Sequence, residues 1–229
     1  MSSHGQQFSN VRVLIFDLDG TLIDSKVDLA LSVNRMLKHM GRAGLPHDRI
    51  FSFVGNGAPI LVRRSLEEGA QSEVTDGEVD RALAHFLSNY RAHMLDHTLP
   101  YPGVREGLEM LKGHPMAVLT NKPVNFSRAI LEGLDLAGYF RRVYGGNSFE
   151  RKKPDPMGVH VLLRELNALP LEAMMVGDSE VDVRTARNAG IWACGVTYGL
   201  GTDGLRANPP DLLVDSLTQL SVRLNGQRN

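Results

Sequence analysis

The sequence has one cysteine, almost no net charge and no long apolar run, and each of these absences excludes a class of protein. Cys194 has no second cysteine for an internal disulfide, so we expect a reducing compartment. The formal net charge of -1 offers no general attraction to nucleic acid or to an acidic membrane surface. No apolar run approaches the ~20 residues that span a bilayer, and the N-terminal MSSHGQQFSN lacks the basic and apolar regions of a signal peptide. We therefore expect a soluble cytoplasmic protein that binds neither nucleic acid nor membrane.

The chain does contain enough apolar residues for a packed core. Of its 229 residues, 42% are hydrophobic and 22% are charged, which is typical of soluble globular proteins. Short apolar runs predict buried strands at Val11–Phe16, Met116–Leu119, Ala173–Val176 and Ile191–Thr197, with a weaker candidate at Leu212–Val214. Helical patterns lie between them at Val104–Leu111, Phe126–Leu134, Val159–Leu166 and Val183–Asn188. This alternation favours a parallel α/β sheet with helices on both faces.

One stretch, from about residue 26 to residue 97, interrupts the alternation because it contains helical patterns alone. Its apolar residues form two helical stripes, which we interpret as core packing. The first stripe is Leu29, Val33, Met36, Leu37 and Met40, and the second is Val79, Leu83, Phe86, Leu87, Tyr90 and Met94. Asp24–Ser25 and Leu99–Gly103 resemble an outgoing and a returning hinge. The pattern therefore predicts a helical insertion after the first strand.

Four short polar clusters lie between the predicted strands and helices. They are Asp17-x-Asp19-Gly20-Thr21, Thr120-Asn121, Lys153-Pro154, and Gly177-Asp178-Ser179 with Asp182. Ligands of an open α/β sheet bind beyond the carboxyl ends of its strands. We therefore expect the four clusters to converge on one site, although they are far apart in the sequence.

The clusters contain the groups that phosphoryl transfer requires. Asp17, Asp19 and Asp178 would repel one another unless a cation joined them, and hard oxygen ligands favour Mg²⁺. A lysine and a threonine can contact phosphate oxygens. One carboxylate can attack phosphorus, while the carboxylate two residues later handles the proton. The combination predicts Mg²⁺-dependent phosphoryl transfer.

Each cluster taken alone also has a simpler interpretation. Asp-x-Asp-Gly-Thr is a common turn composition, although a calcium loop is excluded because its sixth and twelfth positions from Asp17 hold Leu22 and Asp28. Ser179-x-x-Asp182 is a helix-capping pattern, so Asp182 either caps a helix or supports the site. Ser25-x-x-Asp28 repeats the pattern, and there we interpret it as capping alone.

Other motifs do not indicate a cofactor. Gly199-x-Gly201-x-x-Gly204 matches a dinucleotide fingerprint, but we interpret it as a loop that opens no helix, because Asn208-Pro209-Pro210 follows closely. The eight histidines show no metal-ligand spacing. Cys194 lies within a predicted strand and is interpreted as a small core residue. We expect the loop at Gly55–Gly57 to reach the site, since glycine permits close approach of the backbone.

The polar clusters resemble the four motifs of the haloacid dehalogenase superfamily. The matching segments are Asp17-Leu18-Asp19-Gly20-Thr21-Leu22, Leu119-Thr120-Asn121-Lys122, Lys153-Pro154-Asp155-Pro156 and Gly177-Asp178-Ser179-x-x-Asp182. The resemblance implies a Rossmann-like α/β core of residues 1–23 and 98–229, with a small α-helical cap of residues 24–97. Within the superfamily, Val54–Pro59 and Tyr101–Val104 are similar to segments of phosphoglycolate phosphatases.

The resemblance also implies a role for each residue. Asp17 would be the nucleophile and a Mg²⁺ ligand, and Asp19 the general acid–base whose backbone carbonyl also binds the metal. Asp178 would ligate Mg²⁺, and Asp182 would support the metal site without binding the ion directly. Contacts to the phosphoryl group and the rest of the substrate would come from Thr120, Lys153, Asn121, Gly55, Asn56 and Gly57. Lys153 would also restrain Asp17.

The expected function is hydrolysis of a small phosphomonoester, with 2-phosphoglycolate as the best single candidate, through an aspartyl-phosphate. The alternatives within the superfamily are another sugar-phosphate or nucleotide phosphatase and a phosphomutase. A phospho-accepting signalling domain is a distant alternative from another class. The partner is then a small phosphorylated metabolite, and the protein is either a monomer or a homodimer.

Overall fold

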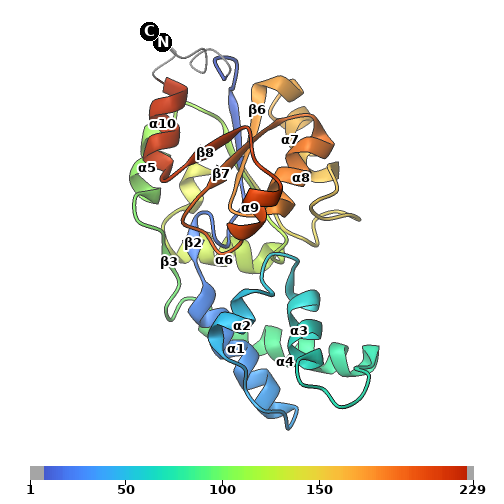
Figure 1. Cartoon of the computed structure of the whole chain (residues 1–229). Helices are drawn as coiled ribbons and strands as arrows, with labels where there is room; N and C mark the ends of the chain where they lie inside the picture. Colours follow the sequence, from blue (N-terminus) through green and yellow to red (C-terminus); the bar gives the residue numbers. More distant parts are fainter. Residues whose placement is uncertain (1–7, 226–229) are drawn as a thin grey trace.

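The core of the protein is a six-stranded parallel sheet (Figure 1). The computed structural model describes residues 8–225. The strands are β1 (Val13–Phe16), β4 (Met116–Leu119), β5 (Arg142–Tyr144), β6 (Ala173–Gly177), β7 (Trp192–Val196) and β8 (Leu212–Val214). Their order is β5-β4-β1-β6-β7-β8, and every neighbouring pair is parallel. The predicted α/β fold class is confirmed.

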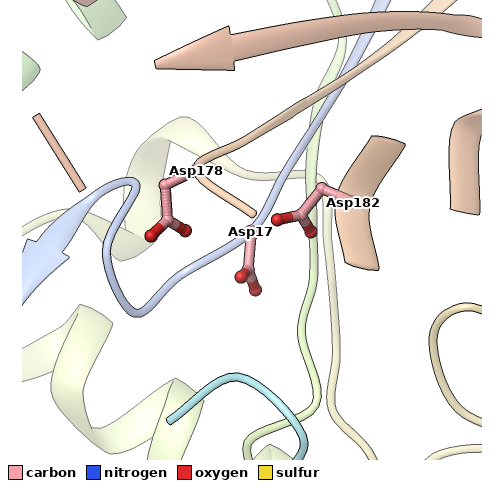
Figure 2. A group of neighbouring side chains, drawn as sticks. All are labelled: Asp17, Asp178 and Asp182. Atoms are coloured by element: carbon pink, nitrogen blue, oxygen red, sulfur yellow. The ribbon is translucent and has the colours of Figure 1, made fainter. Parts of the chain in front are cut away.

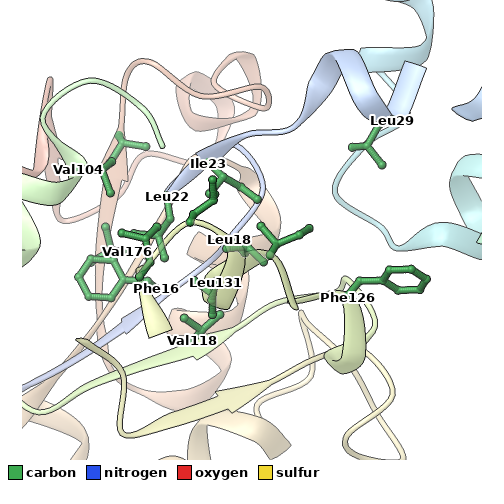
Figure 3. Close-up of a cluster of buried hydrophobic side chains, with 14 of the residues drawn as sticks. Phe16, Leu18, Leu22, Ile23, Leu29, Val104, Val118, Phe126, Leu131 and Val176 are labelled. Atoms are coloured by element: carbon green, nitrogen blue, oxygen red, sulfur yellow. The ribbon is translucent and has the colours of Figure 1, made fainter. Parts of the chain in front are cut away.

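Helices cover both faces of this sheet. One face carries α5 (Val104–Leu111), α6 (Val124–Gly133) and α10 (Leu217–Asn225), and the other carries α7 (Met157–Glu165), α8 (Glu180–Ala189) and α9 (Asp203–Ala207). Short 3-10 turns occur at Ala137–Tyr139 and Pro170–Glu172. Alternate residues of β1 supply the two faces, because successive side chains of a strand point in opposite directions. Figure 3 shows Phe16 gathered with Val118 and Val176 from the neighbouring strands, beside Leu131 of α6.

The predicted strands are present, with bounds that shift by one or two residues. One strand of the six-stranded sheet was not predicted, the three-residue β5 at Arg142–Tyr144. It lies at the edge of the sheet and pairs only with β4. Its side chains are exposed or half-buried, so it lacks the continuous apolar run that identifies the central strands. Within residues 8–225, no helix combines the length and apolar character needed to cross a membrane.

Between β2 (Ile23–Asp24) and β3 (Leu99–Pro100) the chain forms four helices, which lie beyond the carboxyl ends of the sheet strands (Figure 1). They are α1 (Lys26–His39), α2 (His47–Phe51), α3 (Ala58–Glu67) and α4 (Asp76–His93). A capping box between Thr75 and Glu78 begins α4. The two apolar stripes lie on α1 and α4, which pack against each other and join the core beneath them.

The two connections to this helical segment form a small ribbon. Strand β2 pairs with β3 in an antiparallel manner, with Ile23 opposite Pro100 and Asp24 opposite Leu99. The outgoing and returning hinges that the sequence placed separately are therefore hydrogen-bonded to each other. The chain leaves the sheet and returns to it at a single place.

The interpretation of Ser25-x-x-Asp28 as a capping pattern is wrong. Ser25 makes no cap hydrogen bond to the first turn of α1, and its hydroxyl donates to Asp19 at 2.5 Å. The buried Asp28 carboxylate instead accepts hydrogen bonds from the backbone N–H groups of His97 and Thr98 and from the Thr98 hydroxyl, at 2.7–3.1 Å. Asp28 therefore joins the start of α1 to the chain that returns to β3, a partner that no local pattern indicates.

Asp28→Ala is expected to lower the free energy of unfolding by about 2–4 kcal/mol, because it leaves the buried donors of Thr98 and the backbone N–H of His97 without an acceptor. Burial alone raises the pKa of Asp28, but these hydrogen bonds outweigh it and hold the pKa below its usual range. The stabilisation is therefore present above the unfolded pKa of about 3.9 and is lost as the pH falls below it. Urea denaturation at pH 7 and at pH 3 measures both effects. The control is Asp96→Ala, at an exposed ion pair with His93, and equal stability of the two variants would contradict this role.

Candidate active site

Three carboxylates from different parts of the chain meet at the carboxyl edge of the sheet. Asp17 directly follows β1, and Asp178 directly follows β6. With Asp182 from the first turn of α8, each offers a ligand oxygen within 4.8 Å of the others, and all three are buried. In Figure 2 the Asp17 carboxylate lies between those of Asp178 and Asp182. Segments separated by about 160 residues thus form one acidic cluster.

Lys153 joins two of these carboxylates. Its ammonium lies 2.9 Å from Asp17 Oδ1 and 2.6 Å from Asp182 Oδ1, and the side chain is buried. The second oxygen of Asp182 accepts hydrogen bonds from the N–H and hydroxyl of Ser179, at 3.2 and 2.6 Å. Asp182 therefore caps α8 and contacts Lys153 at the same time, so its two alternative interpretations are not exclusive.

The loop after β7 wraps around Asp178. One carboxylate oxygen accepts hydrogen bonds from the N–H groups of Leu200 and Gly201, at 2.7 and 2.8 Å. A Cβ on Gly199 would lie 2.1 Å from the Asp178 Cβ, so only glycine permits this approach. The expectation that the glycine motif opens no helix is wrong, because α9 begins at Asp203. This helix has only five residues, and the glycine loop before it contacts a carboxylate.

The acidic cluster carries more negative than positive charge. Burial, with the charges of Asp182 and Asp17, raises the pKa of Asp178 to about 7. Burial raises the pKa of Asp17 to about 6 although Lys153 opposes the rise. Three buried carboxylates facing one ammonium are costly without a further cation. Their oxygen ligands, within 4.8 Å of one another, fit a hard divalent ion held by Asp17 and Asp178.

Asp19 lies outside this cluster and is held by other groups. Both oxygens of its carboxylate contact the ammonium of Lys122, at 2.9 and 3.0 Å, and the Ser25 hydroxyl donates to one of them. Lys122 is itself buried, with its ammonium 4.6 Å from the centre of the Tyr90 ring on α4. Burial alone lowers the pKa of Lys122, but Asp19 more than offsets this and holds the pKa above its usual range. A charged lysine therefore orients the Asp19 carboxylate.

A cavity of about 50 Å³ separates the sheet edge from the inserted helices. Its polar lining comes from Asp17, Asp19, Thr120, Asn121 and Lys122, and its apolar lining includes Leu61, Phe86, Tyr90 and Phe126. Asp17 and Asp19, two residues apart after β1, thus face the same space. The cavity is the place where a small ligand can contact both carboxylates.

The loop at Gly55–Gly57 reaches this cavity from the helical segment. Asn121 Nδ2 donates to the carbonyl oxygens of Gly55 and Lys153, at 3.1 and 3.0 Å. Lys152 donates to the Asn56 carbonyl at 2.7 Å. Of the residues expected to contact the substrate, Thr120, Asn121, Gly55 and Gly57 line the cavity. Asn56 and Lys153 do not line it, since the former is turned toward Lys152 and the latter lies against Asp17.

Several side chains at the site were not predicted from the sequence. Lys122 directly follows the Thr-Asn pair, so its position at a strand end was the available signal. Tyr90 was interpreted only as part of an apolar stripe, although its hydroxyl distinguishes it from the other members. Nothing in the sequence around Ser25 or Lys152 indicates their contacts, because these contacts depend on the tertiary structure.

Comparisons with known proteins point to a single enzyme family. A family model described as haloacid dehalogenase-like hydrolase matches residues 14–196. A phosphoglycolate phosphatase of Pseudomonas putida is 39% identical over 96% of this chain and 83% of that protein. A phosphoglycolate phosphatase of Colwellia psychrerythraea is 38% identical over 93% of this chain and 96% of that protein.

Solved structures show the same architecture. The crystal structure described as a predicted phosphoglycolate phosphatase from Haemophilus somnus superposes with a TM-score of 0.87 and 32% identity. The superposition covers 92% of this chain and 96% of that one. The likeness therefore includes the helical segment between β2 and β3 as well as the sheet.

Proposed function

Because this chain belongs to the haloacid dehalogenase-like hydrolase family, we propose that it is a Mg²⁺-dependent phosphatase whose substrate is 2-phosphoglycolate. The observation that carries the proposal is the placement of Asp17, which directly follows the central strand β1, contacts Lys153 and faces a small cavity shared with Asp19. The names of relatives at 38–39% identity support the choice of substrate.

In the proposed first step, a carboxylate oxygen of Asp17 attacks phosphorus and the ester P–O bond breaks. Asp19 gives a proton to the departing alkoxide, so that the alcohol leaves and an aspartyl-phosphate remains. Thr120 lines the cavity beside Asp17 and offers its hydroxyl to a phosphoryl oxygen. Lys153 holds Asp17 in place through its 2.9 Å contact.

In the second step, Asp19 takes a proton from water, the water oxygen attacks phosphorus, and the bond to Asp17 breaks. Phosphate is released and both carboxylates return to their starting state. When bound by Asp17, Asp178 and the backbone carbonyl of Asp19, Mg²⁺ would neutralise charge on the phosphoryl oxygens. Asp182 supports this arrangement by holding Lys153.

We propose residues 24–97 as a cap that covers the substrate. Two of its polar contacts with the core, from Asn121 to Gly55 and from Lys152 to Asn56, involve backbone carbonyls of one loop. A helical segment attached through the β2–β3 ribbon can tilt about that ribbon, which admits the substrate and then excludes bulk water.

A panel of phosphate esters, assayed with Mg²⁺ and with EDTA, tests the proposed function. We expect multiple-turnover release of phosphate from 2-phosphoglycolate in Mg²⁺ and its loss in EDTA. Hexose phosphates and nucleotides should be poorer substrates, since the cavity is small. Transfer of phosphate to a second hydroxyl would indicate a mutase, and a single turnover would indicate a phospho-accepting signalling domain.

Mg²⁺ is expected to stabilise the protein more at pH 8 than at pH 5.5. Asp17 and Asp178 have folded-state pKa values raised to about 6 and about 7, so in metal-free protein the stability that their protonation provides is lost as the pH rises through these values. At a hundredfold excess over its Kd, Mg²⁺ should then raise the Tm by about 5–10 °C at pH 8.

Thermal denaturation in Mg²⁺ and in EDTA at the two pH values measures this difference. The control is Asp178→Asn, in which both the Mg²⁺ effect and its pH dependence should shrink. An equal Tm shift at pH 5.5 and pH 8 would contradict the assignment of these carboxylates to the metal.

A further inference from the structure

Lys122 and Tyr90 line the cavity in contact with each other, and their contacts exceed what the proposed chemistry needs. Lys122 follows β4 in the core, whereas Tyr90 lies on α4 in the helical segment. Among the residues that line the cavity, Lys122 is the only lysine or arginine. Its ammonium has three N–H donors, and the two oxygens of Asp19 account for two contacts. The third N–H lies toward Tyr90, whose hydroxyl oxygen the ammonium approaches.

The Tyr90 hydroxyl is an unused donor at the same place. The residue is 2% exposed, and its hydroxyl has no hydrogen-bond acceptor among residues 8–225. Burial raises the pKa of Tyr90 to about 12, so the hydroxyl keeps its proton at neutral pH. The ring packs between Phe86 and Phe126, at 5.6 Å from each. Phenylalanine would satisfy that packing, and a buried hydroxyl whose proton has no acceptor is costly.

We propose that Lys122 and Tyr90 together bind the carboxylate of the substrate, which makes this protein selective for phosphomonoesters that carry a carboxylate close to the phosphate. The inference rests on the proposed function and deepens it. A carboxylate has two acceptor oxygens, so it can accept from the third N–H of Lys122 and from the Tyr90 hydroxyl at once. Asp17 lines the same cavity, which places the reacting phosphorus within reach of the same small molecule.

The size and lining of the cavity restrict the ligand further. About 50 Å³ corresponds to roughly four water-sized positions. A carboxymethyl group fits such a space, whereas a hexose or a nucleoside does not. The apolar neighbours Phe86, Leu61 and Phe126 lower the local dielectric and strengthen a contact between a carboxylate and an ammonium.

A purely structural role explains only part of this arrangement. Neutralising Asp19 accounts for the charge of Lys122, and aromatic packing accounts for the Tyr90 ring. Neither accounts for a buried hydroxyl beside the cavity whose proton has no acceptor among the described residues. Because Tyr90 belongs to the helical segment and Lys122 to the core, a carboxylate bound between them would also hold the two parts together around the substrate.

The test is Tyr90→Phe, assayed on 2-phosphoglycolate and on 2-hydroxyethyl phosphate, in which a neutral hydroxymethyl replaces the carboxylate. We expect the ratio of kcat/KM for the two esters to fall by about tenfold or more, since a hydrogen bond to a charged group is lost from one substrate only. The Tm without ligand should stay constant or rise. Lys122→Gln, measured in the same way, should lower the same ratio and decides the question independently if Tyr90→Phe does not fold.

The matched control is Tyr144→Phe, whose hydroxyl donates to Glu165 on the outer strand β5, and which should leave the ratio unchanged. A ratio that Tyr90→Phe and Lys122→Gln both leave within twofold of wild type would overturn the carboxylate site. Equal hydrolysis of the two esters by the wild type would do the same while leaving the phosphatase assignment intact. Release of phosphate from neither ester would instead reject the proposed function itself.

Discussion

Asp17→Asn should reduce kcat for phosphate release by at least about 10⁴-fold, because the amide has no anionic oxygen to attack phosphorus. The change keeps the shape of the side chain. It also removes one charge from a cluster in which Asp178 and Asp182 already repel it. We therefore expect the variant to fold, with a metal-free Tm at or above that of the wild type at pH 8.

Phosphate release at saturating substrate and Mg²⁺, with circular dichroism on the same samples, separates chemistry from folding. Asp80→Asn is the matched control, since this exposed residue lies on α4 away from the cluster, and it should retain wild-type turnover. Near-wild-type activity of Asp17→Asn in Mg²⁺ would reject the covalent mechanism.

Asp19→Asn should lower kcat by about 10²–10⁴-fold, the range that a positioned acid–base group contributes. The loss has two parts, because the amide can neither protonate the alkoxide nor take a proton from water. Lys122 loses its ion pair in this variant, but Ser25 can still donate to the remaining amide oxygen. The effect should therefore fall on catalysis, with the fold preserved.

Acetyl phosphate distinguishes the loss of proton donation to the leaving group from the loss of proton removal from water. Its leaving group, acetate, departs without a proton, so Asp19→Asn should form the phosphoenzyme from it and then hydrolyse it slowly. A burst of acetate equal to the enzyme concentration, with a phosphoryl group on the protein by mass spectrometry, is the expected result. Equal rates of acetate and phosphate release, with no phosphoenzyme, would contradict the role of Asp19 in the second step.

The sheet was predictable because its central strands are continuous apolar runs that are buried on both faces. The convergence of Asp17 and Asp178 was predictable for a related reason, since parallel strands bring their carboxyl ends to one edge. The edge strand β5 was not predictable, because its three residues are partly exposed and carry no such run. The apolar run that identifies a strand in the sequence reflects burial of that strand, and β5 is only partly buried.

Contacts that are set by the tertiary structure could not be predicted from the sequence, for a different reason. Ser25 and Asp28 match a capping pattern, yet their hydrogen bonds go to Asp19 and to Thr98. Tyr90 fits an apolar stripe equally well with or without its hydroxyl. The periodicity of a helix identifies which face is buried, but it does not identify which polar atom on that face meets a ligand.

The pairing of Ile23 with Pro100 has a consequence for how such proteins diversify. Since the ends of the inserted segment are already adjacent, doubling its length would add only about 0.6 kcal/mol of closure entropy. Recombination can therefore exchange the insert, or fuse a different domain at the same junction, while the strand register beneath it is retained. New substrate preferences can then arise without rebuilding the catalytic edge.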